Sequence, residues 1–143
     1  MNNSNILTKE EEQLDRILLS FKHKMTNSFF EEAKKLELPP SNFEILIYLY
    51  EKGPITMKNI ASWLSITPPS ASSLIDKLVS KELVNRVQSD NDRRTIHISL
   101  GKEAHKLFAK LHRKKVKLFE EMLDKLDKKD KENLVRILNK CIS

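Results

Sequence analysis

Two short strand-like runs joined by a charged turn stand out in a sequence whose other segments have helical spacing. The runs cover residues 83–88 and 95–100, and the second alternates apolar and polar side chains with a period of two. The turn between them reads SDNDRR, and its Asp and Asn residues are typical of hairpin tips. The sequence therefore predicts a β-hairpin with two adjacent arginines, Arg93 and Arg94, at its tip.

Two interpretations of these arginines are open. In the first, the turn is a solvated hairpin tip on which charged side chains are simply well hydrated. In the second, the turn reaches into an anionic partner, because an arginine at a hairpin tip suits the narrow minor groove of DNA, where negative potential is concentrated. A neighbouring aspartate can hold such a guanidinium in one pose. The segments on either side decide between these interpretations.

The part of the chain before the hairpin has the apolar spacing of amphipathic helices. A long helix is expected over residues 7–36, and Pro39 and Pro40 stop it. Ser41 and Glu44 fit a capping box that opens a second helix. The first helix has no local partner for its apolar stripe, which favours packing against another long helix or another chain.

Two more helices are expected before the hairpin and two after it. Thr56 is a plausible N-cap of a short helix, and Thr67 is followed by proline at the first position of the next one. After the hairpin, a long helix is expected over residues 102–126, and Asp127 is the expected N-cap of the last helix.

This order of elements is that of a winged helix-turn-helix: two helices joined by a short turn, then a hairpin. The predicted fold class is mainly α with a small β-hairpin wing. Residues 41–100 are the expected DNA-binding lobe, and residues 1–40 and 101–143 are the expected helical regions around it, in one compact domain overall.

The helix before the hairpin has an apolar side and a side rich in small polar residues. Small side chains allow close approach to a duplex, and hydroxyls can bind phosphates or base edges. The face has no arginine or glutamine for bidentate base reading, which predicts modest direct readout. An ordinary capped helix with a polar solvent face is the alternative. The residues expected at the DNA are Thr67, Pro69, Ser70, Ser72, Ser73 and Lys77.

Composition sets outer limits on the function. Hydrophobic residues make up 39% of the 143 residues, charged residues 32%, and there are only 2 glycines, which favours a helix-rich protein. No apolar run approaches the roughly 18 residues of a membrane span, so no membrane contact is expected. The N-terminal residues lack the pattern of a secretory signal, and a cytoplasmic location is expected.

The net charge of +6 permits nucleic-acid binding without showing it. Residues 101–143 carry 13 basic and 7 acidic side chains, so the surplus lies in the last third of the chain. A DNA-binding hypothesis therefore depends on placed residues. The helix over residues 102–126 has a basic run that is interpreted first as a solvated face, with a secondary role in attracting phosphates as the alternative: Lys106, Lys110, Arg113, Lys114, Lys115 and Lys117.

The sequence gives no support for catalysis. A Gly-rich phosphate loop, a recognisable pair of carboxylates and a nucleophile with its base are all missing, so no catalytic residue and no cofactor is expected. His105 and His112 are seven residues apart, but no third ligand accompanies them, and no metal site is expected.

Two segments of the sequence resemble the MarR (multiple antibiotic resistance regulator) family of winged-helix transcription factors. TPPSASSLIDKLVSKELVNR resembles the family's hydroxyl-rich helix start followed by Leu-Ile/Val-Asp-Lys/Arg-Leu and Leu-Val-x-Arg. DRRTIHISL resembles its wing, with Asp92 and Arg94 on the positions of the Asp-x-Arg motif. The resemblance also covers the flanking helices, and hence nearly the whole chain.

The resemblance implies a homodimer built by the first helix and the last two, bound to a palindromic DNA site. Arg94 would be the wing arginine in the minor groove, Asp92 its orienting partner, and Arg93 would lie near the DNA backbone. Ser70, Ser72 and Ser73 would contact the major groove. With Arg86, which is also a candidate partner for the outward-facing Asp76, the wing residues expected at the DNA are Arg86, Asp92, Arg93 and Arg94.

Members of the family often bind a small aromatic effector in a crevice between the dimer helices and the DNA-binding lobe. Four aromatic residues are candidates for such a crevice, with ordinary core packing as the preferred alternative: Phe29, Phe30, Phe43 and Tyr50. Some members sense peroxide through a cysteine in the first helix, but the single cysteine here is Cys141, which is expected to pack at the dimer interface.

The sequence departs from the family pattern at two positions that frame the hairpin. Glu82 stands where the family often has glycine after the recognition helix, so this helix end needs a different cap. The usual Leu-Thr-x-x-Gly after the wing becomes Leu100-Gly101-x-x-Ala104, which alters the start of the long helix without changing its register.

The sequence and the resemblance together predict a homodimeric transcription regulator, a repressor that a small molecule releases from a palindromic operator. One alternative is an activator or an architectural DNA binder without a ligand. The other is a helical dimer whose winged lobe docks a protein partner.

Overall fold

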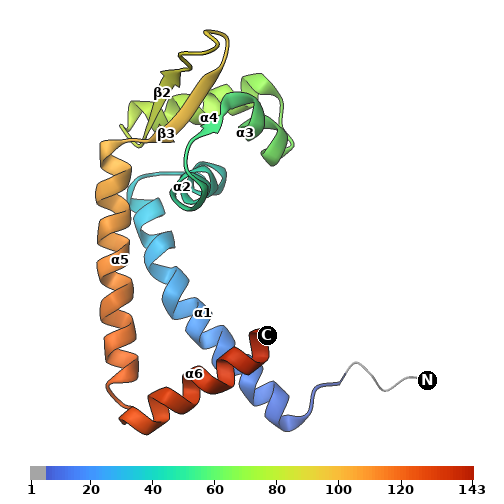
Figure 1. Ribbon diagram of the computed structural model, residues 1–143, viewed down its shortest axis with the longest axis vertical. Coiled ribbons are helices and arrows are strands. Elements are labelled where there is room, and N and C mark those ends of the chain that lie inside the picture. Colours follow the sequence, from blue (N-terminus) through green and yellow to red (C-terminus); the bar gives the residue numbers. More distant parts are fainter. Residues whose placement is uncertain (1–5) are drawn as a thin grey trace, which may run out of the picture. The chain divides into compact units, whose positions relative to one another are not determined.

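A computed structural model describes residues 6–143 of the chain (Figure 1). The helices are α1 (Lys9–Lys35), α2 (Pro40–Lys52), α3 (Met57–Leu64), α4 (Pro68–Ser80), α5 (Lys102–Leu123) and α6 (Lys128–Ile142). The strands are β1 (Ile55–Thr56), β2 (Val84–Gln88) and β3 (Ile96–Leu100). The predicted fold class, mainly α with a β-hairpin wing, is confirmed.

The described chain divides into two compact units. The lobe unit is the single stretch Phe29–Lys110, which contains the end of α1, all elements from α2 to β3 and the start of α5. The helical unit contains residues 6–28 and 111–143, that is, the rest of α1 and α5 together with α6. α1 and α5 are therefore the two helices that continue from one unit into the other.

Side-chain caps set the start of three helices as expected. Thr56, Thr67 and Asp127 each have an extended backbone, and each side-chain oxygen accepts the backbone N–H of the third residue beyond it. Thr67 is followed by Pro68 at the first helical position, where no N–H is needed. Local sequence thus determines where the recognition helix begins.

The expected capping box of Ser41 and Glu44 is wrong. Helix α2 begins one residue earlier, at Pro40, and its N-cap residue Pro39 makes no side-chain cap bond. The fixed backbone angle of proline suits the first turn of a helix, so the second proline opens the helix. The next polar residue, Asn42, is completely buried, and its Nδ2 donates to the Leu74 carbonyl of α4 over 2.8 Å.

The wing is part of a three-stranded antiparallel sheet with the order β1-β3-β2. The hairpin was expected, but β1 was not, because two residues are too few to show alternation. Ile55 of β1 pairs with Ile98 of β3, which in turn pairs with Arg86 of β2. Ile98 of β3 and Val84 of β2 are buried, as are Ile75 and Leu78 of α4, and β2 packs against α4, so the sheet and α4 share one core.

Three helices of the lobe unit's chain end with a non-glycine residue in the left-handed conformation: Glu37, Ser65 and Glu82. At the end of α4, Glu82 N donates to the Val79 carbonyl and Leu83 N to the Leu78 carbonyl, which is the Schellman pattern that glycine usually completes. The departure noted at Glu82 therefore changes the residue and keeps the cap geometry.

Replacing Glu82 with glycine should stabilise the protein by about 1 kcal/mol, because a left-handed backbone costs a non-glycine residue roughly 1–2 kcal/mol and glycine's extra freedom when unfolded offsets part of the gain. Urea unfolding followed by circular dichroism measures this. Lys81→Gly is the matched control, because Lys81 has φ −97° and gains nothing from glycine. A destabilised Glu82→Gly would contradict the assignment.

Candidate nucleic-acid interface

Helix α4 exposes the polar face that the sequence predicted. Ala71, Ile75 and Leu78 are buried, whereas five of the six residues expected at the DNA are exposed: Thr67, Pro69, Ser70, Ser73 and Lys77. The first turn is fixed by its cap, in which Thr67 Oγ1 accepts the Ser70 N–H over 3.3 Å and lies 2.9 Å from Ser70 Oγ. Pro68 and Pro69 have no backbone N–H, and the Ser70 N–H is taken by the Thr67 cap, so this end of α4 offers hydroxyl groups to a phosphate in place of free N–H groups.

Ser72, the sixth residue expected at the DNA, is half-buried and accepts hydrogen bonds from Arg86 of the wing strand β2. Its Oγ accepts from Arg86 Nη2 over 3.3 Å, and its carbonyl accepts from the same nitrogen over 3.4 Å. The same Nη2 lies 2.6 Å from Asp76 Oδ1. Arg86 of β2 therefore joins the wing to the recognition helix, and its guanidinium neutralises the acid that would otherwise face phosphates.

The wing tip is held by Asp92, through the backbone. Its Oδ1 accepts the Arg94 N–H over 2.9 Å, its Oδ2 accepts the Thr95 hydroxyl over 3.1 Å, and its carbonyl accepts the Thr95 N–H. Within residues 6–143 no ion pair joins Asp92 to the Arg94 guanidinium. The expected orienting partner thus fixes the turn on which Arg94 stands and leaves the guanidinium unpaired.

Arg93 and Arg94 are both exposed, but their backbone groups make different hydrogen bonds. The Arg93 carbonyl accepts a hydrogen bond from Gln88 Nε2, which ties that side of the tip to β2. On the other side, Ser89 N donates to the Thr95 carbonyl and closes the hairpin. A rigid tip that presents free guanidinium groups loses little conformational entropy when it docks on DNA.

The four candidate effector residues are only partly brought together. Phe29 and Phe43 meet edge to face with ring centres 6.1 Å apart, and Phe43 is buried. Tyr50 instead stacks on Phe108 at 4.2 Å, and Phe30 is 70% exposed. The contacts of the first pair are those of core packing.

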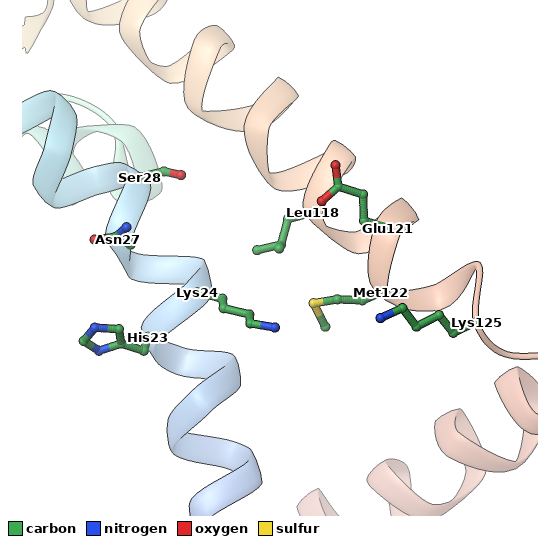
Figure 2. A pocket seen from close by; sticks show the side chains of 8 residues that line it. All are labelled: His23, Lys24, Asn27, Ser28, Leu118, Glu121, Met122 and Lys125. Carbon is green, nitrogen blue, oxygen red and sulfur yellow. The ribbon is translucent and has the colours of Figure 1, made fainter.

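A cavity of about 430 Å³ lies in the helical unit, between α1 and α5. Figure 2 shows Leu118 and Met122 pointing from α5 towards α1, and Lys24 pointing from α1 into the same space. Lys125 lines it as well, whereas His23 turns away in this view. The lining combines the apolar side chains of Leu118 and Met122 with two ammonium groups and the carboxylate of Glu121, so positive charge exceeds negative charge by one, which suits an organic anion.

Acids lie beside three of the six residues of the basic run on α5. Lys106 Nζ lies 2.9 Å from Glu103, and this hydrogen bond lowers the pKa of the Glu103 carboxyl. Lys110 lies 2.9 Å from Glu32, and Lys117 lies 4.0 Å from Glu121. These contacts favour the interpretation of the run as a solvated helix face.

Other types of site are limited by two observations on residues 6–143. No group of three or more His, Cys, Asp or Glu side chains there is arranged to hold a metal ion. In that range, no helix is long and apolar enough to cross a membrane.

A recognition helix with an exposed hydroxyl face, docked by an ion pair to a hairpin with an arginine-bearing tip, defines a winged helix-turn-helix protein. Residues 38–96 match the model of the MarR family. The HTH-type transcriptional regulator YwoH of Bacillus subtilis is 31% identical over 102 residues, which are 71% of this chain and 74% of YwoH. The chain belongs to the MarR family. The relatives that it matches are described as transcriptional regulators.

Solved structures agree on the fold. The transcriptional regulator Tm0710 from Thermotoga maritima superimposes with a TM-score of 0.74 at 17% identity, covering 91% of this chain and 92% of that one. The MepR–DNA complex of S. aureus gives 0.68 at 22% identity, with 90% and 96% covered. At these identities the likeness concerns the fold alone.

Sequence reasoning missed Glu32. Its side chain is 5% exposed and contacts Lys35 and Lys110, the second of which is 78 residues away. A glutamate among the many charges of an amphipathic helix gives no local signal that it is buried. The sequence offers one hint: Glu32 lies two helical turns after Met25, on the same apolar stripe.

Proposed function

We propose that this chain is a homodimeric repressor that binds a palindromic DNA operator and is released by a small organic effector. The observation that carries the DNA-binding part is the pairing of two exposed elements in one unit: the hydroxyl face of α4 and the arginine tip of the β2–β3 hairpin, joined by Arg86. The helix suits the major groove and the tip suits the adjacent minor groove. The similar MepR was solved bound to DNA.

The proposed dimer is supported by apolar side chains that the helical unit leaves exposed. A single chain with this much uncovered apolar surface gains free energy by burying it against a second copy. The residues in question lie on α1 and α6: Leu14, Ile17, Leu18, Phe21, Leu134, Val135, Ile137, Leu138 and Ile142. Two recognition helices in such a dimer would read half-sites roughly 34 Å apart.

The proposed effector is an organic anion. The cavity of Figure 2 supports this, because its volume of about 430 Å³ falls in the range of small-molecule sites and two lysines line it, Lys24 of α1 and Lys125 just beyond the end of α5. The aromatic set of Phe29, Phe30, Phe43 and Tyr50 remains the sequence-based alternative for the effector site.

The test selects fragments of the source genome on the immobilised full-length protein and then measures binding of the enriched fragment against salt. We expect one palindromic sequence, bound by two chains. A dimer that neutralises six to ten phosphates should lose about 10³–10⁵ in affinity between 50 and 200 mM salt. Repression is then read from a reporter behind that fragment.

One alternative has a specific observation in its favour. The exposed face of α4 carries no arginine or glutamine, so an architectural binder with little sequence preference is compatible with it. Selection that enriches no common sequence, combined with steep salt dependence, would support that alternative. A winged lobe that docks a protein partner predicts no retained DNA at any salt concentration.

A further inference from the structure

A buried glutamate joins α1 and α5 at the place where both helices leave the lobe unit. Glu32 of α1 is 5% exposed, and its Oε2 lies 2.9 Å from Lys110 Nζ of α5. Its Oε1 lies 3.2 Å from Lys35 Nζ, one turn further along α1. The lobe unit spans Phe29–Lys110, so Glu32 is within one turn of its first residue and Lys110 is its last residue.

This position matters because the chain passes between the lobe and helical units only twice. It crosses once in α1, between Ser28 and Phe29, and once in α5, between Lys110 and Leu111. The Glu32–Lys110 ion pair therefore cross-links the two crossing helices beside both crossing points. Two other ion pairs lie near the start of α5: Lys106–Glu103 is within α5, and Lys102–Glu82 joins two positions that are both well inside the lobe unit.

Because the Glu32 carboxylate is buried, breaking its ion pair with Lys110 costs more free energy than breaking an exposed ion pair would. A buried carboxylate needs its counter-charge, whereas exposed ion pairs contribute little. Lys35 is on the same helix as Glu32 and moves with it, so of these two lysines it is Lys110 that links Glu32 to α5. If the two helices separate here, Glu32 loses the ammonium group of Lys110.

We propose that Glu32 and Lys110 form a latch that fixes how the DNA-binding lobe is carried by α1 and α5, and that they are thereby specificity-determining residues for half-site spacing. The inference rests on the proposed dimeric DNA-binding function. Neither residue contacts DNA in this proposal; both are positioning residues. An intact latch restricts the spacing that the two lobes of a dimer can adopt, and a broken latch widens it.

The first test needs no DNA. Nitroxide labels are placed on cysteines introduced at Lys58 of the lobe unit and Lys128 of the helical unit in a Cys141→Ser background, and doubly labelled chains are diluted with unlabelled ones. Pulsed electron spin resonance then gives the distance distribution within one chain. We expect Lys110→Met to broaden the distribution and Lys106→Met to leave it unchanged. Both variants remove one positive charge from α5, so charge is matched.

The second test measures affinity for the selected operator with its natural spacer and with the spacer lengthened by two base pairs. We expect the preference of the parent protein for the natural spacer to fall about fivefold or more in Lys110→Met and in Glu32→Gln, and to persist in Lys110→Arg and Lys106→Met. Thermal melting shows that each variant is folded. Glu32→Gln is isosteric and tests the latch from the other helix.

The outcomes are distinct. Equal distance distributions for Lys110→Met and Lys106→Met would overturn the latch, whatever the protein does with DNA. A broadened distribution in a protein that retains no DNA would support the latch as a conformational restraint and overturn the proposed function together with the spacing role. A broadened distribution with an unaltered spacer preference would overturn the specificity role alone.

Discussion

Arg94→Ala is expected to weaken operator binding about thirtyfold or more while the dimer stays intact. Loss of an arginine from a groove costs about 1–3 kcal/mol, and a symmetric dimer loses one from each wing. The guanidinium is exposed at the tip, on a turn that Asp92 fixes through the Arg94 N–H. The Arg94 side chain is exposed and makes no hydrogen bond or ion pair within residues 6–143, so folding should be unaffected.

Arg93→Ala is the matched control for this prediction. It removes the same charge from the adjacent position, while the Arg93 carbonyl keeps its hydrogen bond from Gln88. If Arg93 lies near the DNA backbone, its loss should weaken binding evenly across sequences and lower the salt slope by about one per subunit. Gel-shift titrations on the selected fragment at several salt concentrations measure both variants.

The contrast between the two arginines carries the conclusion. A much larger loss for Arg94→Ala, confined to the selected sequence, would support insertion of this side chain into the minor groove. Unchanged affinity of Arg94→Ala would show that the wing assignment is wrong. Equal and purely salt-dependent losses would mean that the tip acts only as a patch of positive charge.

Local rules made the wing and the recognition helix readable from the sequence. The Thr67-Pro68 start needs only residues that follow one another, and the hairpin needs only alternation around a turn. The family motifs then assigned roles to Asp92 and Arg94. The sequence also offers Arg86 as a partner for Asp76, and the structure places Arg86 Nη2 2.6 Å from Asp76 Oδ1.

Features that depend on distant residues could not be read in this way. The strand β1 exists because Ile55 meets Ile98 across the fold, and two residues show no periodicity. Glu32 is buried because α5 brings Lys110 to it. The start of α2 was expected at a Ser41 cap but lies at Pro40. Pro39 and Pro40 signal the end of the first helix equally well, and the sequence does not show that the second of them also begins the next helix.

The departure at Gly101 has the largest expected effect on stability. A Cβ at this position would overlap the carbonyl oxygen of Glu82 and lie 3.0 Å from its carbonyl carbon. That oxygen also accepts the Glu103 N–H at the first turn of α5, and Gly101 N donates to the Leu83 carbonyl over 2.8 Å. The obstacle is backbone held by hydrogen bonds, so no side-chain rotation relieves it.

Gly101→Ala should therefore destabilise the protein by about 3 kcal/mol, the upper part of the range for inserted carbon atoms in a packed site. For a domain of this size the melting temperature should fall by roughly 10 °C. Gly53→Ala gives the cost of backbone strain without overlap, because a Cβ there meets nothing within 4 Å, whereas φ +85° and ψ −166° cost alanine about 1–3 kcal/mol. A Gly101→Ala variant that melts with the parent protein would contradict the packing argument.

The two departures from the family pattern should also be coupled, because Glu82 is the residue that Gly101 touches. Glycine at position 82 would let the carbonyl of that residue move away from an added Cβ, which glutamate in a left-handed conformation resists. We expect Glu82→Gly to restore more stability to Gly101→Ala than the about 1 kcal/mol that it gives alone. A double-mutant cycle by urea unfolding measures the difference. Strict additivity would mean that the two positions changed independently, whereas coupling would explain why glycine stands at 101 in a chain that has glutamate at 82.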